Sequence, residues 1–314
     1  MRRRYGPLTN SVVCGLLSGW AVVGLAQAEG GETGDSGRTN QIFRFAFTSN
    51  MFPEVNENDA RAAMKVWIQQ ISEARHIAAD SNPLIFHDVQ TVAAAFKTNT
   101  ISGVGLTAPE FATLSRTQNF NRLGVAAYDG RRIVEQYVVL VRKESQIVKL
   151  DQLVGRTLTV LESPRMSLAT IWLDDELVGA GQKRCSEFFA RVDAKEKASL
   201  VVLPVFFKRV DACLVTSNSF SVMGEMNPQL LKEMRVLAIS PPVIPAFFAF
   251  CPEDEKSPHP ELFLAMTQMH GTVAGKQLLA LVKAECILDE PTNCLGPTLD
   301  LINLHDRLMN GNMP

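Results

Sequence analysis

Short apolar runs alternate along this chain with stretches in which apolar residues recur at helical spacing. The run 42–47 is apolar apart from Arg44 and predicts a mostly buried strand, whereas 59–76 has the spacing of a helix with one apolar face. Further strands are predicted at 83–86, 102–106, 123–127, 136–141, 157–161, 210–215, 235–239 and 246–250. Further helices are predicted at 89–96, 163–178, 198–207, 260–283 and 299–308, and from 108 and 217 onward. This alternation predicts an α/β fold with a largely parallel sheet.

Polar residues follow several of the predicted strands at the point where the chain turns into a helix. In open α/β sheets, ligands bind outside the carboxyl ends of the strands. Topology alone therefore places the segments 48–50 and 107–111 at an edge that faces a ligand. Ser217 and its neighbour Thr216 follow a later strand, where they serve either as ligand donors or as a plain helix cap.

The strongest candidate site is the turn from Ser163 to Ser167, which follows a strand and opens a helix. Unpaired backbone N–H groups and the positive end of the helix dipole favour an anion at such a turn. The hydroxyls of Ser163 and Ser167 add donors, and Arg165 can pair with a phosphonate, phosphate or carboxylate through two hydrogen bonds. The alternative is an ordinary cap, with Ser163 at its start, Pro164 in the first turn and Arg165 in solvent.

The N-terminus has the pattern of an export signal. Three arginines at 2–4 precede a mainly apolar stretch at 11–25, and 26–28 reads Ala-Gln-Ala, which is a small-x-small cleavage site. The apolar stretch is short for a membrane span, so a cleaved signal peptide at 1–28 is favoured over an uncut anchor or a lipoprotein site at Cys14. The Gly-, Ser- and Thr-rich segment 29–40 is predicted to be a disordered lead-in.

Export permits disulfide bonds. Five cysteines follow the predicted signal peptide, so at least one is left without an intramolecular partner. Cys286 and Cys294 flank the turn-like stretch Asp289-Glu290-Pro291 and are the pair most easily bridged.

Charge and histidine spacing exclude several classes of function. The whole chain has 31 basic and 33 acidic residues and no basic block, so nothing favours binding to nucleic acid or a lipid surface. The five histidines show no metal-binding spacing, and no nucleophile or phosphate-loop motif occurs. Met266 and Met269 beside His270 could suggest copper, but methionines at helical spacing usually fill a core. We therefore expect no catalysis, no metal and no cofactor.

Several motifs in this order resemble the phosphate/phosphite/phosphonate-binding periplasmic proteins, which are the extracytoplasmic receptors of ABC transporters. The matching stretches are Tyr137-Val138-Val139-Leu140-Val141-Arg142-Lys143, the pattern D-x-L-x-G-R-x-L-x-V at 151–160, the turn 163–167, Val210-Asp211-Ala212, Gly105-Leu106-Thr107-Ala108-Pro109-Glu110-Phe111 and the strand 245–250. The resemblance spans about 42–282. It implies a two-lobed fold of the type II periplasmic binding proteins, with mixed sheets flanked by helices and a ligand cleft between the lobes. Lobe one would comprise 41–143 plus 242–314, and lobe two 144–241.

The resemblance also implies ligand-binding positions. The family places hydroxyls and an aromatic ring where this chain has Thr48, Ser49, Asn50 and Phe52 in one loop and Thr107 and Phe111 in another. Packing of Phe52 and Phe111 in the lobe core is the alternative interpretation. Ser199 corresponds to a position where the family often has a Ser-His pair. This chain departs from the family there, because no histidine is adjacent, and again at Arg165 and Met166.

These observations favour a periplasmic protein that captures a small anion, a phosphorus oxyanion or phosphonate, for a membrane ABC permease. Two other roles would use the same fold. One is a ligand-sensing partner of a membrane sensor protein, and the other is a ligand-free assembly protein whose cleft is filled by its own side chains. A periplasmic enzyme finds no support in the residue pattern.

Overall fold

The computed structural model describes residues 42–53, 55–128, 131–251 and 259–310. The predicted signal peptide at 1–28 and the predicted lead-in at 29–40 lie outside these residues. Two β-sheets organise the described chain, and we call each sheet with its helices a lobe. Mixed sheets flanked by helices confirm the predicted α/β class, but the prediction of a largely parallel sheet is wrong, because both sheets contain antiparallel as well as parallel strand pairs.

The first lobe contains a six-stranded sheet in the order β11-β4-β10-β3-β1-β2. Its strands are β1 (Phe45–Thr48), β2 (Leu84–Phe86), β3 (Gly103–Thr107), β4 (Arg122–Ala127), β10 (Ala246–Phe250) and β11 (Cys286–Pro291). β1 pairs in parallel with both β2 and β3, while β10 is antiparallel to β3 and β4. The parallel strands β1 and β3 therefore end at the same edge of the sheet, at Thr48 and Thr107.

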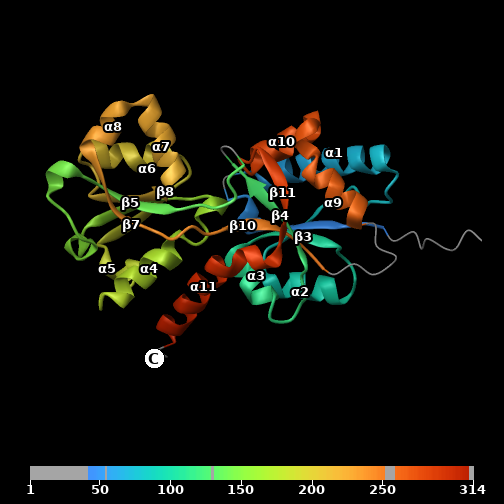
Figure 1. Cartoon of the computed structure of the whole chain (residues 1–314), viewed down its shortest axis with the longest axis horizontal. Helices are drawn as coiled ribbons and strands as arrows, with labels where there is room; N and C mark the ends of the chain where they lie inside the picture. Colours follow the sequence, from blue (N-terminus) through green and yellow to red (C-terminus); the bar gives the residue numbers. More distant parts are fainter. Residues whose placement is uncertain (1–41, 54, 129–130, 252–258, 311–314) are drawn as a thin grey trace, which may run out of the picture. The chain divides into compact units, whose positions relative to one another are not determined.

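Helices cover both faces of this first sheet (Figure 1). α1 (Glu57–Arg75), α9 (His259–Thr267) and α10 (Val273–Leu281) enclose one core, in which Phe45 packs against Trp67 and Phe248. α2 (Val89–Lys97), α3 (Ala108–Leu114) and α11 (Gly296–Met309) lie on the other face. Short 3-10 turns occur at Ser49–Met51 (η1), Met269–Gly271 (η5) and Thr292–Leu295 (η6).

The second lobe contains a five-stranded sheet in the order β7-β6-β8-β5-β9. Its strands are β5 (Tyr137–Arg142), β6 (Thr157–Leu161), β7 (Arg191–Lys195), β8 (Ala212–Thr216) and β9 (Met234–Ile239). Its helices are α4 (Ala169–Gly179), α5 (Cys185–Phe188), α6 (Ala198–Phe206), α7 (Ser217–Met226) and α8 (Pro228–Glu233), with 3-10 turns at Lys143–Ser145 (η2), Leu150–Leu153 (η3) and Pro164–Met166 (η4). β6, β7 and β8 are mutually parallel, so their carboxyl ends share one edge.

The chain crosses between the lobes twice, and the two crossings pair with each other. Glu135 and Val243 exchange backbone hydrogen bonds of 2.7 and 2.9 Å. The predicted lobe boundary at 143 is wrong by one strand, because β5 pairs with β8 and β9 and so belongs to the second sheet. β4 and β5 lie in different sheets. The crossing therefore falls near Glu135 rather than after β5.

Most predicted elements are present, and the differences have local causes. The predicted helix 260–283 is broken into α9, η5 and α10, because the backbone of Thr272 is extended and its hydroxyl caps α10 by accepting from the Gly275 N–H at 3.0 Å. The predicted helix 163–178 begins with η4, and α4 starts only at Ala169. β7 was missed because it is an edge strand with charged residues at Arg191, Asp193 and Lys195, which resemble a loop in sequence.

The predicted Cys286–Cys294 disulfide is wrong. All five described cysteines are free thiols. The stretch between this pair is not a turn, because it forms strand β11, and Cys294 lies beyond it in η6. A strand rises ~3.3 Å per residue, so the two ends of β11 are ~16 Å apart. A disulfide requires Cα atoms within about 7 Å.

Helix α11 contacts both lobes. It packs against α3 of the first lobe and α4 of the second. The Nδ1 atom of His305 on α11 lies 2.7 Å from the Asp175 carboxylate on α4, and the Thr298 hydroxyl of α11 accepts from the Ile244 backbone N–H at 2.8 Å. Within the described part of the chain, no helix is both long enough and apolar enough to span a membrane.

Candidate functional site

A pocket of about 510 Å³ is lined by residues of both lobes. The first lobe contributes the ends of β1 and β3, with Asn50, Thr107 and Glu110, and the second lobe contributes the end of β6 and the turn that follows it. Two carboxylates, Glu110 and Glu162, line this pocket, and no Lys or Arg is among the described residues around it. We call it the acidic pocket.

Glu110 is the best-connected polar group of this pocket. Its Oε2 atom accepts hydrogen bonds from the Thr48 hydroxyl at 2.7 Å and from both the backbone N–H and the hydroxyl of Thr107 at 2.8 Å. Its Oε1 atom accepts from the Asn50 amide at 2.8 Å. Three residues predicted to bind ligand thus come together at the edge expected from topology. In this structure, however, their donors are directed at a carboxylate of the protein itself.

A second pocket, of about 420 Å³, lies beside the ends of β6, β7 and β8. Lys197 and Arg165 from the second lobe and Lys283 from the first line it, and Glu196 is the one carboxylate among its described lining residues. The first residues of α6 and the N-cap of α7, Thr216, also line it. Helix N-termini carry partial positive charge, so these helix starts and the two lysines favour an anion, whereas Glu196 opposes one. We call it the basic pocket.

Ser163 lines both pockets and so lies at their junction. It also lines a third, smaller pocket of about 150 Å³, together with Phe52 and the segment from Ala280 to Lys283. Ser167 lines the acidic pocket, and its hydroxyl donates at 2.7 Å to the Pro245 carbonyl at the second crossing. The predicted turn 163–167 therefore does lie where the two lobes meet.

Arg165 is held by Glu135 instead of extending into solvent. Its Nε donates to Glu135 Oε1 at 2.7 Å, a terminal N–H donates to the same oxygen, and its guanidinium carbon lies 4.0 Å above the Tyr128 ring. Burial raises the pKa of the Glu135 carboxyl, an effect that the neighbouring Arg165 charge opposes. Arg165 still lines the basic pocket, but its hydrogen bonds fix the turn to the crossing strand.

The two phenylalanines predicted near the ligand differ in position. Phe111 is buried in the first-lobe core, with ring centroids 5.2 Å from Phe120 and 5.0 Å from Phe247. It is absent from the described lining of the three pockets. Phe52 is also buried, against Phe47 at 5.2 Å, yet it lines the third pocket. The packing interpretation therefore fits Phe111 better than a ligand role.

Of the remaining predicted residues, Thr48, Ser49, Ser199 and Ser217 are absent from the described lining of the three pockets, whereas Thr216 lines the basic pocket. Thr48 is 1% exposed and lies beneath Glu110, and Ser49 is half-buried in η1. Ser199 is exposed in the first turn of α6, while the Ser217 backbone N–H donates to the Gln136 carbonyl at 2.7 Å. Thr216 accepts from the Ser219 N–H at 3.0 Å as the N-cap of α7.

Sequence reasoning missed Glu110, Lys197 and Lys283. The spacing Thr107-x-x-Glu110 is that of a capping box, in which the Glu side chain accepts from the Thr backbone N–H, and this signal could have drawn attention to Glu110. Lys197 directly precedes α6 and was detectable as a charge at a strand-to-helix turn. Lys283 follows α10 in the other lobe, and only the tertiary structure brings it to this pocket.

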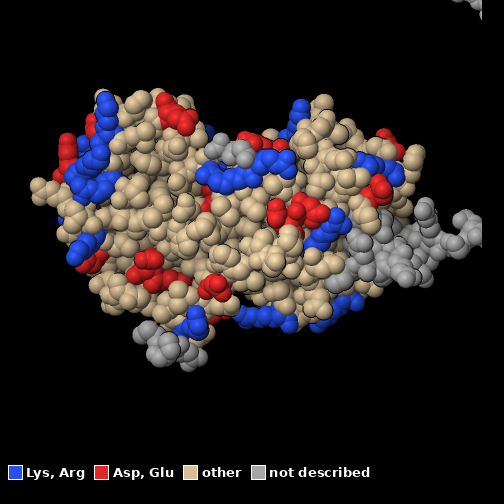
Figure 2. Space-filling view, viewed as in Figure 1, with Lys and Arg blue, Asp and Glu red and all other residues tan. Residues whose placement is uncertain are grey.

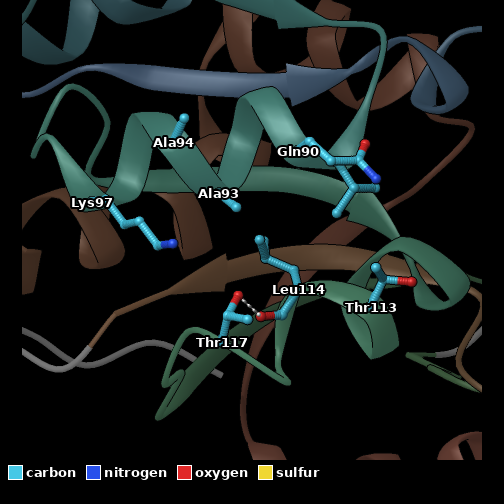
Figure 3. A pocket seen from close by; sticks show the side chains of 8 residues that line it. Gln90, Ala93, Ala94, Lys97, Thr113, Leu114 and Thr117 are labelled. Carbon is cyan, nitrogen blue, oxygen red and sulfur yellow. Dashed lines mark hydrogen bonds between the residues drawn. The ribbon is translucent and has the colours of Figure 1, made fainter.

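A further pocket, of about 320 Å³, lies between α2 and α3 (Figure 3). Its lining is mainly the alkyl parts of Ala93, Ala94 and Leu114, and the Thr117 hydroxyl beside them donates to the Leu114 carbonyl. None of its described lining residues lines the acidic or the basic pocket. Basic and acidic side chains are interspersed over the face drawn in Figure 2, without a large field of one sign. Among the described residues, no group of three or more His, Cys, Asp or Glu is arranged to hold a metal ion.

Comparisons of the fold find similar solved structures. XAC2383 from Xanthomonas citri bound to chloride is 13% identical, with a TM-score of 0.58 over 86% of this chain and 99% of that chain. A binding protein component of an ABC phosphonate transporter from Pseudomonas aeruginosa (PA3383) is 11% identical, with a TM-score of 0.56 over 87% and 89%. PhnD1 from Prochlorococcus marinus (MIT 9301) in complex with methylphosphonate is 12% identical, with a TM-score of 0.55 over 87% and 100%. At these identities the likeness shows the fold.

The family assignment rests on the sequence itself. No curated protein sequence matches the chain. The family described as "ABC transporter, phosphonate, periplasmic substrate-binding protein" matches residues 50–287, which is most of the chain and contains parts of both lobes. The similar structures have the type II periplasmic-binding-protein fold, and the family is one of solute-binding proteins rather than enzymes. The chain therefore belongs to the periplasmic substrate-binding proteins of phosphonate ABC transporters.

Proposed function

We propose that this protein captures a small phosphorus oxyanion or phosphonate between its lobes and delivers it to a membrane ABC permease. The observation that carries the proposal is the basic pocket, which combines Lys197 of the second lobe with Lys283 of the first. An anion that contacts a cation from each lobe binds the closed arrangement more tightly than the open one. It therefore shifts the population toward closure, which is the change that a permease can detect.

The second lobe offers the pre-formed part of the proposed anion site. β6, β7 and β8 end side by side, and α6 and α7 begin directly after β7 and β8. In α7 the Ser217 N–H already donates to the Gln136 carbonyl and the Ser219 N–H to the Thr216 hydroxyl, so the backbone donors of the proposed site come mainly from the first turn of α6. Lys197 lies at the N-cap of α6, and Ser163 follows β6. An oxyanion placed here would receive backbone, hydroxyl and ammonium donors without rearrangement of the sheet.

The crossing strands supply the proposed hinge. Glu135 and Val243 pair through two backbone hydrogen bonds, and Glu135 also holds Arg165 in the turn after β6. Closure by hinge motion requires only a few residues to change their backbone angles. The Glu135–Arg165 pair would keep the turn attached to the hinge strand while the rest of each lobe moves.

Export through a signal peptide at 1–28, followed by its removal, belongs to the same proposal.

Isothermal titration calorimetry with methylphosphonate and inorganic phosphate tests this function. We expect K197A and K283A each to weaken binding by about tenfold or more, because a hydrogen bond to a charged group contributes about 1.5–3 kcal/mol. K276A is the matched control, since Lys276 is an exposed lysine on α10 that does not line the basic pocket. Failure of the unaltered protein to bind either compound, or equal effects of all three variants, would contradict the proposal.

A further inference from the structure

The donors at the ends of β1 and β3 already hold an anionic group. Thr48 and Thr107 are 1% and 4% exposed, so their hydroxyls are buried, and both donate to Glu110 Oε2. The Thr107 N–H and the Asn50 amide complete a set of four hydrogen bonds, all 2.7–2.8 Å long. Two hydroxyls, an amide and a backbone N–H would suit a ligand oxyanion equally well. Glu110 thus occupies the position that the first lobe would otherwise offer to such a group.

These four donors are uncharged, so they stabilise the Glu110 carboxylate without cancelling its charge. Glu162 adds a second carboxylate to the same pocket from the other lobe. An anionic group that entered the acidic pocket would therefore meet two like charges and a donor set already in use. Like-charge juxtaposition in a binding site is an effective way to reject a wrong partner.

The acidic pocket and the basic pocket both include Ser163 and Leu161, so one ligand seated at their junction would face both. Its anionic group would lie toward Lys197 and Lys283. Whatever part of the ligand extends toward Glu110 must then be uncharged or cationic. The charges of the two pockets together thus define which ligands fit and which do not.

We infer that Glu110 is a specificity-determining residue, which fills the anion position of the first lobe and restricts the ligand to one anionic group, with an uncharged or cationic remainder facing the acidic pocket. This inference rests on the proposed function for the location of that anionic group. Whether Glu110 keeps an anion from the Thr48, Asn50 and Thr107 donors can nevertheless be tested independently of that location.

The first test uses two ligands that differ in one charge. Phosphonoacetamide and phosphonoacetate have the same phosphonate group, but the far end is a neutral amide in one and a carboxylate in the other. Calorimetry on the unaltered protein should show phosphonoacetamide binding about tenfold or more tighter. E110Q keeps the shape of the side chain and removes its charge, so the preference should fall to about threefold or less. E162Q removes a charge from the same pocket but releases none of the four donors, and it should lower the preference less than E110Q does.

The second test asks whether emptying the position creates an anion site. E110A should bind sulfate at least about tenfold more tightly than the unaltered protein, and a crystal structure should place that sulfate on Thr48, Asn50 and Thr107. E110Q should show no such gain, because its amide still fills the position. If E110A does not fold, the isosteric E110Q still shows whether the charge of Glu110 causes the preference for phosphonoacetamide over phosphonoacetate.

The outcomes separate this inference from the proposed function. If the unaltered protein binds neither phosphonoacetamide nor phosphate, the proposed function fails, and sulfate binding by E110A still decides the role of Glu110. If phosphonoacetamide and phosphonoacetate bind the unaltered protein equally well, the inference is overturned while the proposed function stands. It is likewise overturned if E110A gains no sulfate affinity, or if E162Q lowers the preference as much as E110Q.

Discussion

Arg165 donates two hydrogen bonds to a single oxygen of Glu135, and this pair joins the turn after β6 to the strand that crosses between the lobes. The Glu135 side chain is 1% exposed and that of Arg165 13%, so the ion pair is almost entirely removed from water. A charge left alone at such a position is far more costly than the pair. The contact therefore couples the integrity of the proposed ligand turn to the hinge.

Breaking this pair from either side should destabilise the protein strongly. R165A and E135A each leave one buried charge uncompensated, and we expect a loss of about 3–5 kcal/mol in the free energy of unfolding, measured by urea denaturation. The double variant E135M/R165M removes both charges and keeps much of the volume, so it should lose less than the sum of the single losses. Strictly additive losses would show that the two side chains are not energetically coupled.

The Asp175 carboxyl on α4 should make stability depend on pH. Burial raises its pKa above the ordinary 3.8, Asp174 and Glu176 add to this rise, and His305 opposes it. The folded protein therefore holds this proton to higher pH than the unfolded chain does. The contribution of Asp175 to the free energy of unfolding is full below pH 3.8 and is lost as the pH rises through the raised pKa.

The variant D175N isolates this effect, because its amide oxygen can still accept a hydrogen bond from His305. The unfolding free energy of the unaltered protein, minus that of D175N, should decrease as the pH rises from about 4. E176Q, at the exposed neighbouring position, should show a much smaller pH dependence of the same difference. A difference for D175N that increases with pH would contradict the assigned direction of the pKa shift.

The cysteines should all react as thiols once the protein is unfolded. Burial raises the pKa of Cys251 and of Cys294 to about 11, so both should react slowly with iodoacetamide in the folded state. In denaturant without reductant, intact mass spectrometry should find all five described cysteines modified. Modification of only three would reveal a disulfide and would contradict the assignment of five free thiols.

Phe111 should contribute to stability and not to ligand affinity. Truncation of a buried phenylalanine costs about 3–5 kcal/mol, so F111A should lower the free energy of unfolding by this amount. Its dissociation constant for methylphosphonate, measured below the unfolding temperature, should stay within about twofold of the unaltered value. F52A is the matched comparison, since Phe52 is equally buried but lines the third pocket. A large affinity loss confined to F111A would return this ring to the ligand site.

The sequence predicted this fold well because its strands are short, apolar and bounded by turn residues. The strand predicted at 157–161 coincides with β6 and that at 246–250 with β10. The expectation that ligands bind at the carboxyl ends of the strands also placed Thr48 and Thr107 at one edge of the sheet, where the structure adds Glu110. These features depend on local periodicity and on the parallel pairing of β1 with β3.

The parts that the sequence could not predict depend on partners far along the chain. The role of Arg165 was unpredictable because Glu135 lies 30 residues away and only the crossing strand brings it near. Lys283 reaches the basic pocket from the other lobe. The supposed disulfide failed because a stretch rich in acidic residues and proline was read as a turn, whereas antiparallel pairing with β4 makes it strand β11.

The central claim is that an oxyanion binds between Lys197 and Lys283. The most direct measurement is a crystal structure of the protein in complex with methylphosphonate. This account predicts the phosphonate oxygens within hydrogen-bond distance of both ammonium groups and of the first-turn N–H groups of α6 or α7, with no phosphonate oxygen on the Thr48, Asn50 and Thr107 donors. A phosphonate bound at those donors with Glu110 displaced, or bound outside the cleft altogether, would contradict it.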